Sequence, residues 1–462
     1  MALRLFPRRQ PHSRPRRDGI DFRITRPIRI SIMLGLFLVF FTFSPAVILY
    51  TAGYRFSWQD KAIKKTGVIS LDAEPTDAEV LINGIAVKGK MPLRLANRAP
   101  GSYRLVIRRE GYIPWSTDIV VASNQTTFIK DVRLFKQSKP ERFSLLSDPV
   151  EAVYAAPDAD SLLALTYTTS TWRIMHVKPS AQKTTSLAEV PRTALPPTVS
   201  LSPDRTAALI ISGDDAGRPE LTLIDMERPE TKKTVAFGGN QSPRYQWSQT
   251  GPAGRLFIEA NGTLEIVSPG EPQKIVGSVS SPVWFAESQS KIWTLQGTTL
   301  TSLVNGRDEA AYTIARPAES IIDANQHRII LGYSDGLEVM KFKDGRQDRV
   351  VSISGAKPHF HPETRTWWVY SDWEVWSVYD NGDVSLLRRN GEPISVVRAL
   401  DRFGVMLLAN DQKITGFNPG YYVSQELART QSIGAIDVDT RLRRIYFTDQ
   451  TDEAARLMSL EY

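Results

Sequence analysis

The chain of 462 residues contains no cysteine. This absence excludes disulfide bonds, thiol nucleophiles and metal sites built on cysteine. It leaves the compartment open, because a large exported domain with a sufficient core needs no disulfide. Histidine is scarce as well: the whole chain has five, and only His359 and His361 are close together in the sequence.

Short catalytic motifs are scarce. The chain has no Gly-x-Gly-x-x-Gly dinucleotide motif, and the Gly-x-x-x-x-Gly-Lys pattern at Gly84–Lys90 lacks the serine or threonine that follows it in a phosphate loop. Gly332–Gly336 has Gly-x-Ser-x-Gly spacing, but it lies among expected strands, whereas a nucleophile elbow joins a strand to a helix. The acid pairs Asp214–Asp215 and Asp158 with Asp160 fall in expected turns, where solvated carboxylates are common. The sequence therefore favours binding over catalysis and indicates no cofactor.

Excess charge of one sign is confined to the N-terminus. The net charge is +7, and residues 1–29 alone hold nine arginines against two aspartates. The remaining chain has equal numbers of basic and acidic side chains. A nucleic-acid-binding body needs a net or clustered basic surface. The balanced charge removes that electrostatic argument, and we expect no nucleic-acid partner.

Residues 30–50 carry no charge. As a helix they would be roughly 30 Å long, which matches the apolar core of a bilayer. The basic tail 1–29 then predicts a cytoplasmic N-terminus, with the bulk of the chain outside the plasma membrane. Two alternatives stay open: a signal peptide cleaved near Ser44 and Ala46, and an inverted topology that keeps the body in the cytoplasm.

After a juxtamembrane linker at 51–66, residues 67–136 alternate short apolar runs with turn signals. The Asn83–Gly84 pair between two such runs predicts a hairpin, since both central residues of that turn need positive φ. About seven strands in such a short segment predict a small β-sandwich.

Landmarks in this segment resemble the PEGA domain, a family associated with bacterial and archaeal envelope proteins. They are Pro75, Thr76, Asp77, Ala78, Asn83, Gly84, Pro100, Gly101, Gly111 and Tyr112. Asp77 stands where the family has glycine, and aspartate tolerates a left-handed turn position. The resemblance implies a structural motif, an envelope location and a scaffolding or adhesive role, without catalytic residues.

Residues 137–462 contain repeats of two short apolar strands joined by a polar turn. Their turn positions are 37 to 46 residues apart, at Ala156, Ser202, Ser248, Ala286, Ala324, His361, Leu400 and Val438. A period near 40 with only strands is typical of a β-propeller. The turns at Ser202–Asp204 and Phe447–Asp449 resemble those of WD40-like, TolB-like and YWTD-type propellers.

The ends of the chain predict how the propeller closes. The last repeat lacks a fourth strand, and residues 141–146 stand alone before the first repeat. One blade shared by both termini would remove the open edge of the sheet. Because eight repeats are visible, we favour eight blades over seven.

Two clusters are candidate sites. The first is a group of tryptophans in the sixth repeat: Trp367, Trp368, Trp373 and Trp376. Their rings could stack on a glycan or anchor a protein partner, or they could pack between neighbouring blades. His359 and His361 share one strand face near Glu363 and are weak metal candidates. Their place in the repeat favours a blade turn, so we expect no metal.

Together these patterns predict an all-β ectodomain, PEGA sandwich plus propeller, behind one transmembrane helix at 30–50. The preferred function is a bacterial envelope scaffold whose propeller binds an envelope protein or a cell-wall polymer. The alternative is a membrane-tethered hydrolase or lyase acting on envelope glycan or peptide. Convergent titratable side chains at the mouth of the propeller channel would favour that alternative.

Overall fold

The computed structural model describes residues 26–51, 54–57, 62–192, 196–213, 219–236, 244–249, 254–450 and 455–462. The arginines before residue 26, much of the linker and the pair Asp214–Asp215 lie outside these residues. The chain forms two compact units. One holds Met1–Leu71, Pro92–Tyr103 and Ile119–Lys130, and the other holds Asp72–Met91, Arg104–Asp118 and Asp131–Tyr462.

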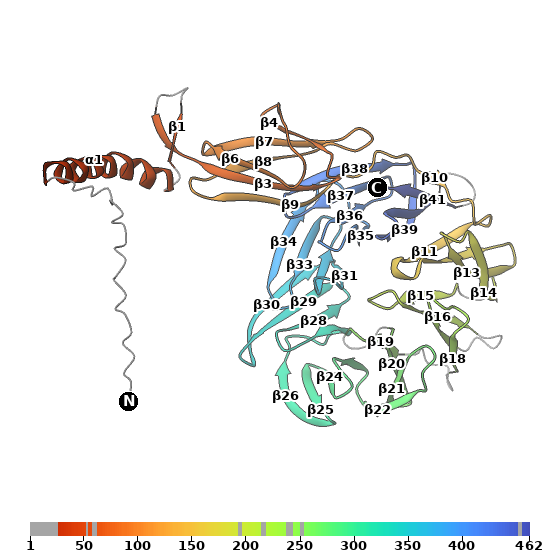
Figure 1. Ribbon diagram of the computed structural model, residues 1–462. Helices are drawn as coiled ribbons and strands as arrows, with labels where there is room; N and C mark the ends of the chain where they lie inside the picture. Colours follow the sequence, from red (N-terminus) through yellow and green to blue (C-terminus); the bar gives the residue numbers. More distant parts are fainter. Residues whose placement is uncertain are drawn as a thin grey trace, which may run out of the picture. The chain divides into compact units, whose positions relative to one another are not determined.

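The apolar stretch forms one helix, α1 (Arg26–Thr51), drawn in red in Figure 1. Pro45 lies inside it without ending it. In the last turn the Thr51 hydroxyl donates to the carbonyls of Val47 and Ile48, both at 3.0 Å, which partners two groups that a helix end leaves free. The helix is long and apolar enough to cross a membrane, and a signal sequence would meet the same description.

A short hairpin follows, formed by β1 (Tyr54–Ser57) and β2 (Ala62–Lys65). The next seven strands make two sheets. The three-stranded sheet has the order β6 (Leu93–Arg98), β3 (Gly67–Glu74), β9 (Thr126–Arg133). The four-stranded sheet has the order β5 (Ile85–Val87), β4 (Glu79–Ile82), β7 (Gly101–Arg108), β8 (Trp115–Val121).

Local chemistry explains these strands. Burial alternates along β3, where Ile69, Leu71 and Ala73 are buried, as period-two patterning requires. The predicted Asn83–Gly84 turn is present between β4 and β5, with φ of 50° and 80°.

Eight four-stranded antiparallel sheets occupy the described residues from 141 to 461. The first four sheets are β11 (Val150–Ala156), β12 (Ser161–Tyr167), β13 (Thr171–Lys178), β14 (Lys183–Pro191); β15 (Thr198–Leu201), β16 (Ala207–Gly213), β17 (Pro219–Asp225), β18 (Lys232–Ala236); β19 (Arg244–Trp247), β20 (Leu256–Ala260), β21 (Thr263–Val267), β22 (Lys274–Ser278); β23 (Val283–Ala286), β24 (Lys291–Gln296), β25 (Thr299–Val304), β26 (Arg307–Thr313).

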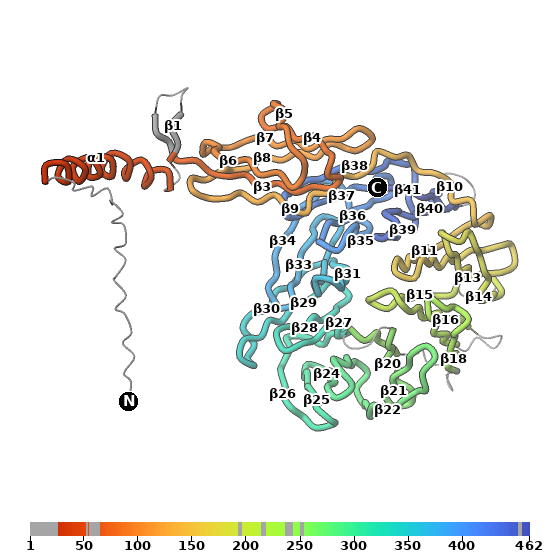
Figure 2. The backbone as a smooth tube through the Cα atoms, in the orientation of Figure 1, coloured from red at the N-terminus to blue at the C-terminus, as the bar shows by residue number. Residues whose placement is uncertain are grey.

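The other four sheets are β27 (Ser320–Ala324), β28 (Arg328–Tyr333), β29 (Gly336–Lys343), β30 (Arg346–Ser354); β31 (Lys357–His361), β32 (Thr366–Tyr370), β33 (Glu374–Val378), β34 (Val384–Arg389); β35 (Val396–Ala399), β36 (Met406–Ala409), β37 (Lys413–Asn418), β38 (Val423–Arg429); β39 (Ile433–Asp439), β40 (Arg444–Asp449), β41 (Arg456–Glu461), β10 (Glu141–Arg142). Figures 1 and 2 show that they follow one another around a ring, as in a β-propeller.

The ring closes as the sequence predicts. Glu141 and Arg142 of β10 pair with Ser459 and Met458 of β41, so the first and last strands share one sheet. The first strand of the next sheet, β11, contacts β39 and β40 of this shared sheet. Such closure leaves no free edge between the two ends of the ring.

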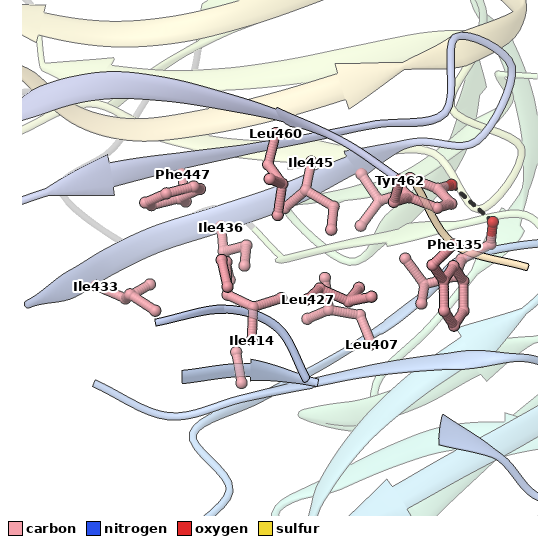
Figure 3. Packing of buried hydrophobic residues seen from close by; sticks show 14 of the residues in the cluster. Phe135, Leu407, Ile414, Leu427, Ile433, Ile436, Ile445, Phe447, Leu460 and Tyr462 are labelled. Atoms are coloured by element: carbon pink, nitrogen blue, oxygen red, sulfur yellow. Dashed lines mark hydrogen bonds between the residues drawn. The ribbon is translucent and has the colours of Figure 1, made fainter. Parts of the chain in front are cut away.

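The core consists of apolar clusters between successive sheets. Figure 3 shows one of them, where Leu407 and Ile414 pack with Ile436 and Phe447. Tyr462 ends the chain inside this cluster, and its hydroxyl donates to the Leu400 carbonyl at 2.7 Å. Such clusters lie between all successive sheets of the ring, so each of these eight sheets buries part of both faces, unlike a sheet with one wet face.

Segments near the start of the second unit attach to the last sheets. Phe135 packs into the cluster of Figure 3. Trp115 lies edge-on to Tyr421 at 5.3 Å between ring centroids, and the Gln425 amide donates to the carbonyls of Ile113 and Pro114 at 3.2 and 3.1 Å. Residues 113–115 and Phe135 therefore pack against the last sheets through buried side chains and backbone hydrogen bonds.

Candidate functional site

The repeated turn positions mark one end of the propeller. In each sheet of the ring that position lies within one residue of the end of the first strand, as with Ala156 in β11 and His361 in β31. Residues in or just after the first strands of five sheets line one pocket of about 100 Å³, among them Asp158, Arg205 and His359, so these strand ends lie together. We call it the channel-end pocket.

A buried carboxylate, Asp437 of β39, organises this channel-end pocket. Asp437 accepts from the Ala155 backbone N–H at 2.8 Å and from the Arg205 guanidinium at 2.6 and 3.1 Å. Arg398 Nε lies 3.3 Å from Oδ1, the oxygen that also accepts from Arg205 Nη2. The Ala155 N–H and the guanidiniums of Arg205 and Arg398, from three other sheets, therefore converge on one side chain that is 5% exposed.

These contacts set the protonation state. Burial alone would raise the pKa of Asp437, but Arg205 and Arg398 reverse this effect and hold that pKa below its usual range. An ionised carboxylate with all these donors is a poor proton acceptor. Asp437 therefore ties sheets together at the channel end and is unsuited to general base catalysis.

The two histidines of β31 differ in their surroundings. His359 lines the pocket; burial, with Arg398 and Arg205 nearby, lowers its pKa well below the usual value and keeps the imidazole neutral. His361 is buried, and its two ring nitrogens lie 2.8 Å from Thr364 Oγ1 and 3.1 Å from the Asp401 carbonyl. Among the described residues no group of three or more acids or histidines is placed to hold a metal ion.

Trp367 lies inside the interface between sheets β27–β30 and β31–β34. It is 8% exposed and its Nε1 donates to Asp323 Oδ2 at 3.0 Å. Arg328 donates to the same oxygen at 2.9 and 2.7 Å and to the Val378 carbonyl at 3.2 Å. This indole is a partner in a buried ionic network and has no surface to offer a ligand.

Trp368 points to the other face of the same sheet. It is 3% exposed, stacks on His361 at 4.7 Å between centroids, and packs with Met406, Leu408 and Phe417 of the next sheet. Alternation sends neighbouring tryptophans to opposite faces, and neighbouring sheets cover both faces. Packing between blades, the second interpretation of the sequence, describes both residues.

Trp373 and Trp376 have different surroundings. Trp373 lies in the turn between β32 and β33 and is 53% exposed. The half-buried Trp376 donates from Nε1 to Glu374 Oε2 at 3.1 Å. Of the four tryptophans predicted to bind, Trp373 is therefore the one whose ring is available to a partner.

The landmarks of residues 67–136 hold turns. Pro75 accepts from the Ala78 N–H at 3.1 Å, and Gly111 has φ of 76°. Asp77 has no positive φ, so aspartate in place of glycine introduces no left-handed strain. Its carboxylate lies 2.9 Å from Arg109 Nη2, and Arg109 also covers the Tyr112 ring at 5.1 Å.

Sequence reasoning did not single out Arg205, Arg398 or Asp437. A signal was present: Arg398 and His359 each stand two residues before a repeated turn position, and Asp437 stands one before. Polar residues recurring there, on the innermost strands, mark side chains that can converge at the ring axis.

The family comparison gives one result. Residues 66–134 match the PEGA domain model. The PEGA domain accounts for the two sheets β3–β9, and the predicted resemblance is confirmed. The search of curated proteins found no match.

Solved structures similar to the chain include three proteins. An uncharacterized protein of Listeria monocytogenes EGD-e has 9% identity and a TM-score of 0.42, covering 63% of this chain and 98% of its own. AztD from Citrobacter koseri has 11% identity and a TM-score of 0.39, covering 61% and 90%. Sqt1 from Saccharomyces cerevisiae has 9% identity and a TM-score of 0.44, covering 71% and 100%.

Proposed function

We propose that this protein is a membrane-anchored binding protein of the bacterial cell envelope, whose exported propeller recognises an envelope protein or a cell-wall polymer. Helix α1 anchors it in the plasma membrane, and the arginines before it keep the N-terminus in the cytoplasm. The PEGA match and the closed ring of sheets support a scaffold that presents turns to a partner.

The observation that carries the proposal is the exposed indole of Trp373. Trp367, Trp368 and Tyr370 of its sheet are buried, and Phe360 and Trp376 are half-buried. Trp373 is 53% exposed at a turn, more than Tyr379, which is 41% exposed. Exposed aromatic rings on rigid turns are typical anchors for partners, because they bury much area and lose little conformational entropy.

The enzymatic alternative rests on the channel-end pocket. Titratable side chains do converge there, and neutral His359 is a candidate base. Incubation of the full chain with peptidoglycan and envelope peptides, followed by mass spectrometry of released products, tests this alternative. Release that stops in the His359→Gln variant would favour the hydrolase or lyase, and no release would remove it.

The binding proposal is tested with the full-length protein in lipid nanodiscs. Immobilised nanodiscs are exposed to envelope extract, and retained material is separated into proteins and wall polymer and identified by mass spectrometry and sugar analysis. Trp373→Ala is compared with Tyr422→Ala, which removes another aromatic ring, 64% exposed, from the turn between β37 and β38.

We expect one identified component to be retained by the wild type and by Tyr422→Ala, and to be lost in Trp373→Ala. Equal retention by all three proteins would move the binding surface away from the sixth repeat. If empty nanodiscs retain the same material as the protein, the binding proposal is wrong.

A further inference from the structure

A second pocket lies at the opposite end of the sheets from the channel-end pocket. It has a volume of about 350 Å³ and lies between sheets β31–β34 and β35–β38. Its wall is the loop of residues 390–394, Arg388 of β34 and the facing ends of β36, β37 and β38. We call it the inter-sheet pocket.

Charges in the lining of the inter-sheet pocket balance. Lys413 lies between two carboxylates, with its Nζ 3.1 Å from Glu392 and 3.7 Å from Glu426. Arg388 is the other cation; its Nε donates to Asn390 Oδ1 at 3.1 Å and its guanidinium also bonds Ser424. Two positive and two negative side chains give the lining itself no net charge, and Glu426 is also paired with Arg429, outside the lining, at 3.0 Å. The lining therefore has no excess of either sign to select an ion.

The same lining offers donors and acceptors side by side. Carboxylates accept only, Arg388 and Lys413 donate only, and the amides of Asn390 and Asn410 do both. A ligand that matches this mixture must itself donate and accept at several neighbouring positions. Hydroxyl groups, each one donor and two acceptors, do so.

The apolar surface in the lining is small. Ile394, Leu408 and Ala409 border the pocket but are only 1 to 4% exposed, whereas Pro393 of the same lining is exposed. A sugar ring has C–H groups on its faces and hydroxyls around its edge, so it fits a pocket with one exposed proline ring and an otherwise polar lining.

Trp373 is attached to this pocket through the backbone. The Asn390 N–H donates to the Trp373 carbonyl at 2.8 Å, and the Ile394 N–H donates to the Asp372 carbonyl at 2.8 Å. The turn that carries the exposed indole is therefore bonded to both ends of the loop that lines the pocket. A chain longer than the pocket can contact both.

We propose that the inter-sheet pocket binds a short segment of a neutral saccharide, with Glu392, Glu426 and Lys413 as its hydrogen-bonding partners. This inference rests on the proposed function and selects a glycan, rather than a protein, as the partner. The volume is near the lower end of ligand pockets, roughly 300–1,000 Å³, so one or two sugar rings occupy it.

Isothermal titration of the full-length protein in nanodiscs tests the assignment. The probes are neutral trisaccharides of glucose, galactose, mannose and N-acetylglucosamine, with the galacturonic acid trimer as the charged comparison. The test variant is Glu392→Gln, which replaces a charged acceptor by an amide of the same shape. The control is Glu309→Gln. Glu309 is also half-exposed, and its carboxylate lies 3.3 Å from a lysine, Lys291. Both residues belong to sheet β23–β26, which does not line the inter-sheet pocket.

We expect at least one neutral trimer to bind with a Kd of about 1 mM or tighter. Glu392→Gln weakens it by about tenfold, since hydrogen bonds to charged groups are the stronger ones. Glu309→Gln leaves it unchanged. Binding of none of the neutral trimers, tighter binding of the charged trimer, or an equal effect of both variants overturns the saccharide assignment.

The two proposals fail in different ways. If nanodiscs retain an identified envelope protein but no trimer binds, the saccharide assignment is wrong and the binding function stands. If a neutral trimer binds and Glu392→Gln weakens it while nothing is retained from the envelope, the pocket assignment stands and the envelope function is wrong.

Discussion

The two faces of sheet β31–β34 show how the same kind of interface can be closed or open. On one face Trp367, Asp323 and Arg328 form a dry network in which Arg328 is 2% and Asp323 7% exposed. On the other face Trp368 seals the inner part, but the outer part opens into the pocket around Lys413, Glu392 and Glu426. Both faces hold pairs of opposite charge. The pair on the first face is buried, and the pairs on the second face are partly exposed.

That difference in burial sets what each set of charges can do. A buried pair is costly to desolvate and very costly to break, so it must be fully hydrogen-bonded. The half-exposed pairs of the inter-sheet pocket contribute little to stability and can exchange their partners for a ligand. The closed face therefore maintains the ring, and the open face is the better candidate for binding.

Breaking the closed face should have the largest effect. Arg328→Ala leaves Asp323 buried without its cation and is expected to lower the free energy of unfolding by about 3–5 kcal/mol. Urea denaturation followed by tryptophan fluorescence measures it. Arg316→Ala is the control, since Arg316 binds the exposed Asp335 at 2.8 Å and its loss should lower stability far less than the loss of Arg328. Equal losses would contradict the comparison.

Trp368 is buried and Trp373 is exposed, so their alanine variants separate a loss of packing from a loss of binding. Trp368→Ala leaves a cavity next to His361 and should destabilise the protein by about 3–5 kcal/mol. Trp373→Ala removes an exposed ring and should change stability by no more than about 0.5 kcal/mol. Circular dichroism during urea denaturation, which does not depend on indole fluorescence, compares them. A large loss in Trp373→Ala would show that its ring is packed.

His359 of strand β31 predicts that the free energy of unfolding depends on pH. The folded state lowers the pKa of His359 below 6.5, so the unfolded chain binds this proton more readily and stability falls as pH drops below about 6.5. Between that value and the folded pKa the slope from this group is at most about 1.4 kcal/mol per pH unit. Unfolding free energies measured from pH 7.5 to 5 should show a shallower slope in His359→Gln. An unchanged slope would contradict the assignment.

The smallest effect is expected on the open face. Glu392→Gln weakens one half-exposed contact with Lys413, so its cost in stability should be about 1 kcal/mol or less. Its melting temperature, measured by circular dichroism, should therefore be close to that of the wild type. A large destabilisation would show that the lining of the pocket belongs to the structural core.

Much of the fold follows from local patterns. The uncharged run became α1, Asn83–Gly84 became a turn with two positive φ values, and the repeated turn positions ended the first strands of their sheets. The pairing of the first and last strands was predictable because each end lacked a partner. The candidate sites were harder to predict from the sequence. The run of aromatic residues indicated a binding surface, yet Trp367 and Trp368 are buried.

The sequence by itself determined the elements, the order of the sheets and the PEGA domain, because strand period, turn residues and repeat length are properties of neighbouring residues. Only the tertiary structure decided which charges meet. Arg205, Arg398 and Asp437 come from three sheets, and Glu392 and Glu426 meet at Lys413 through the packing of a loop against the next sheet. Such contacts depend on the rotation between sheets, and no local period encodes that rotation.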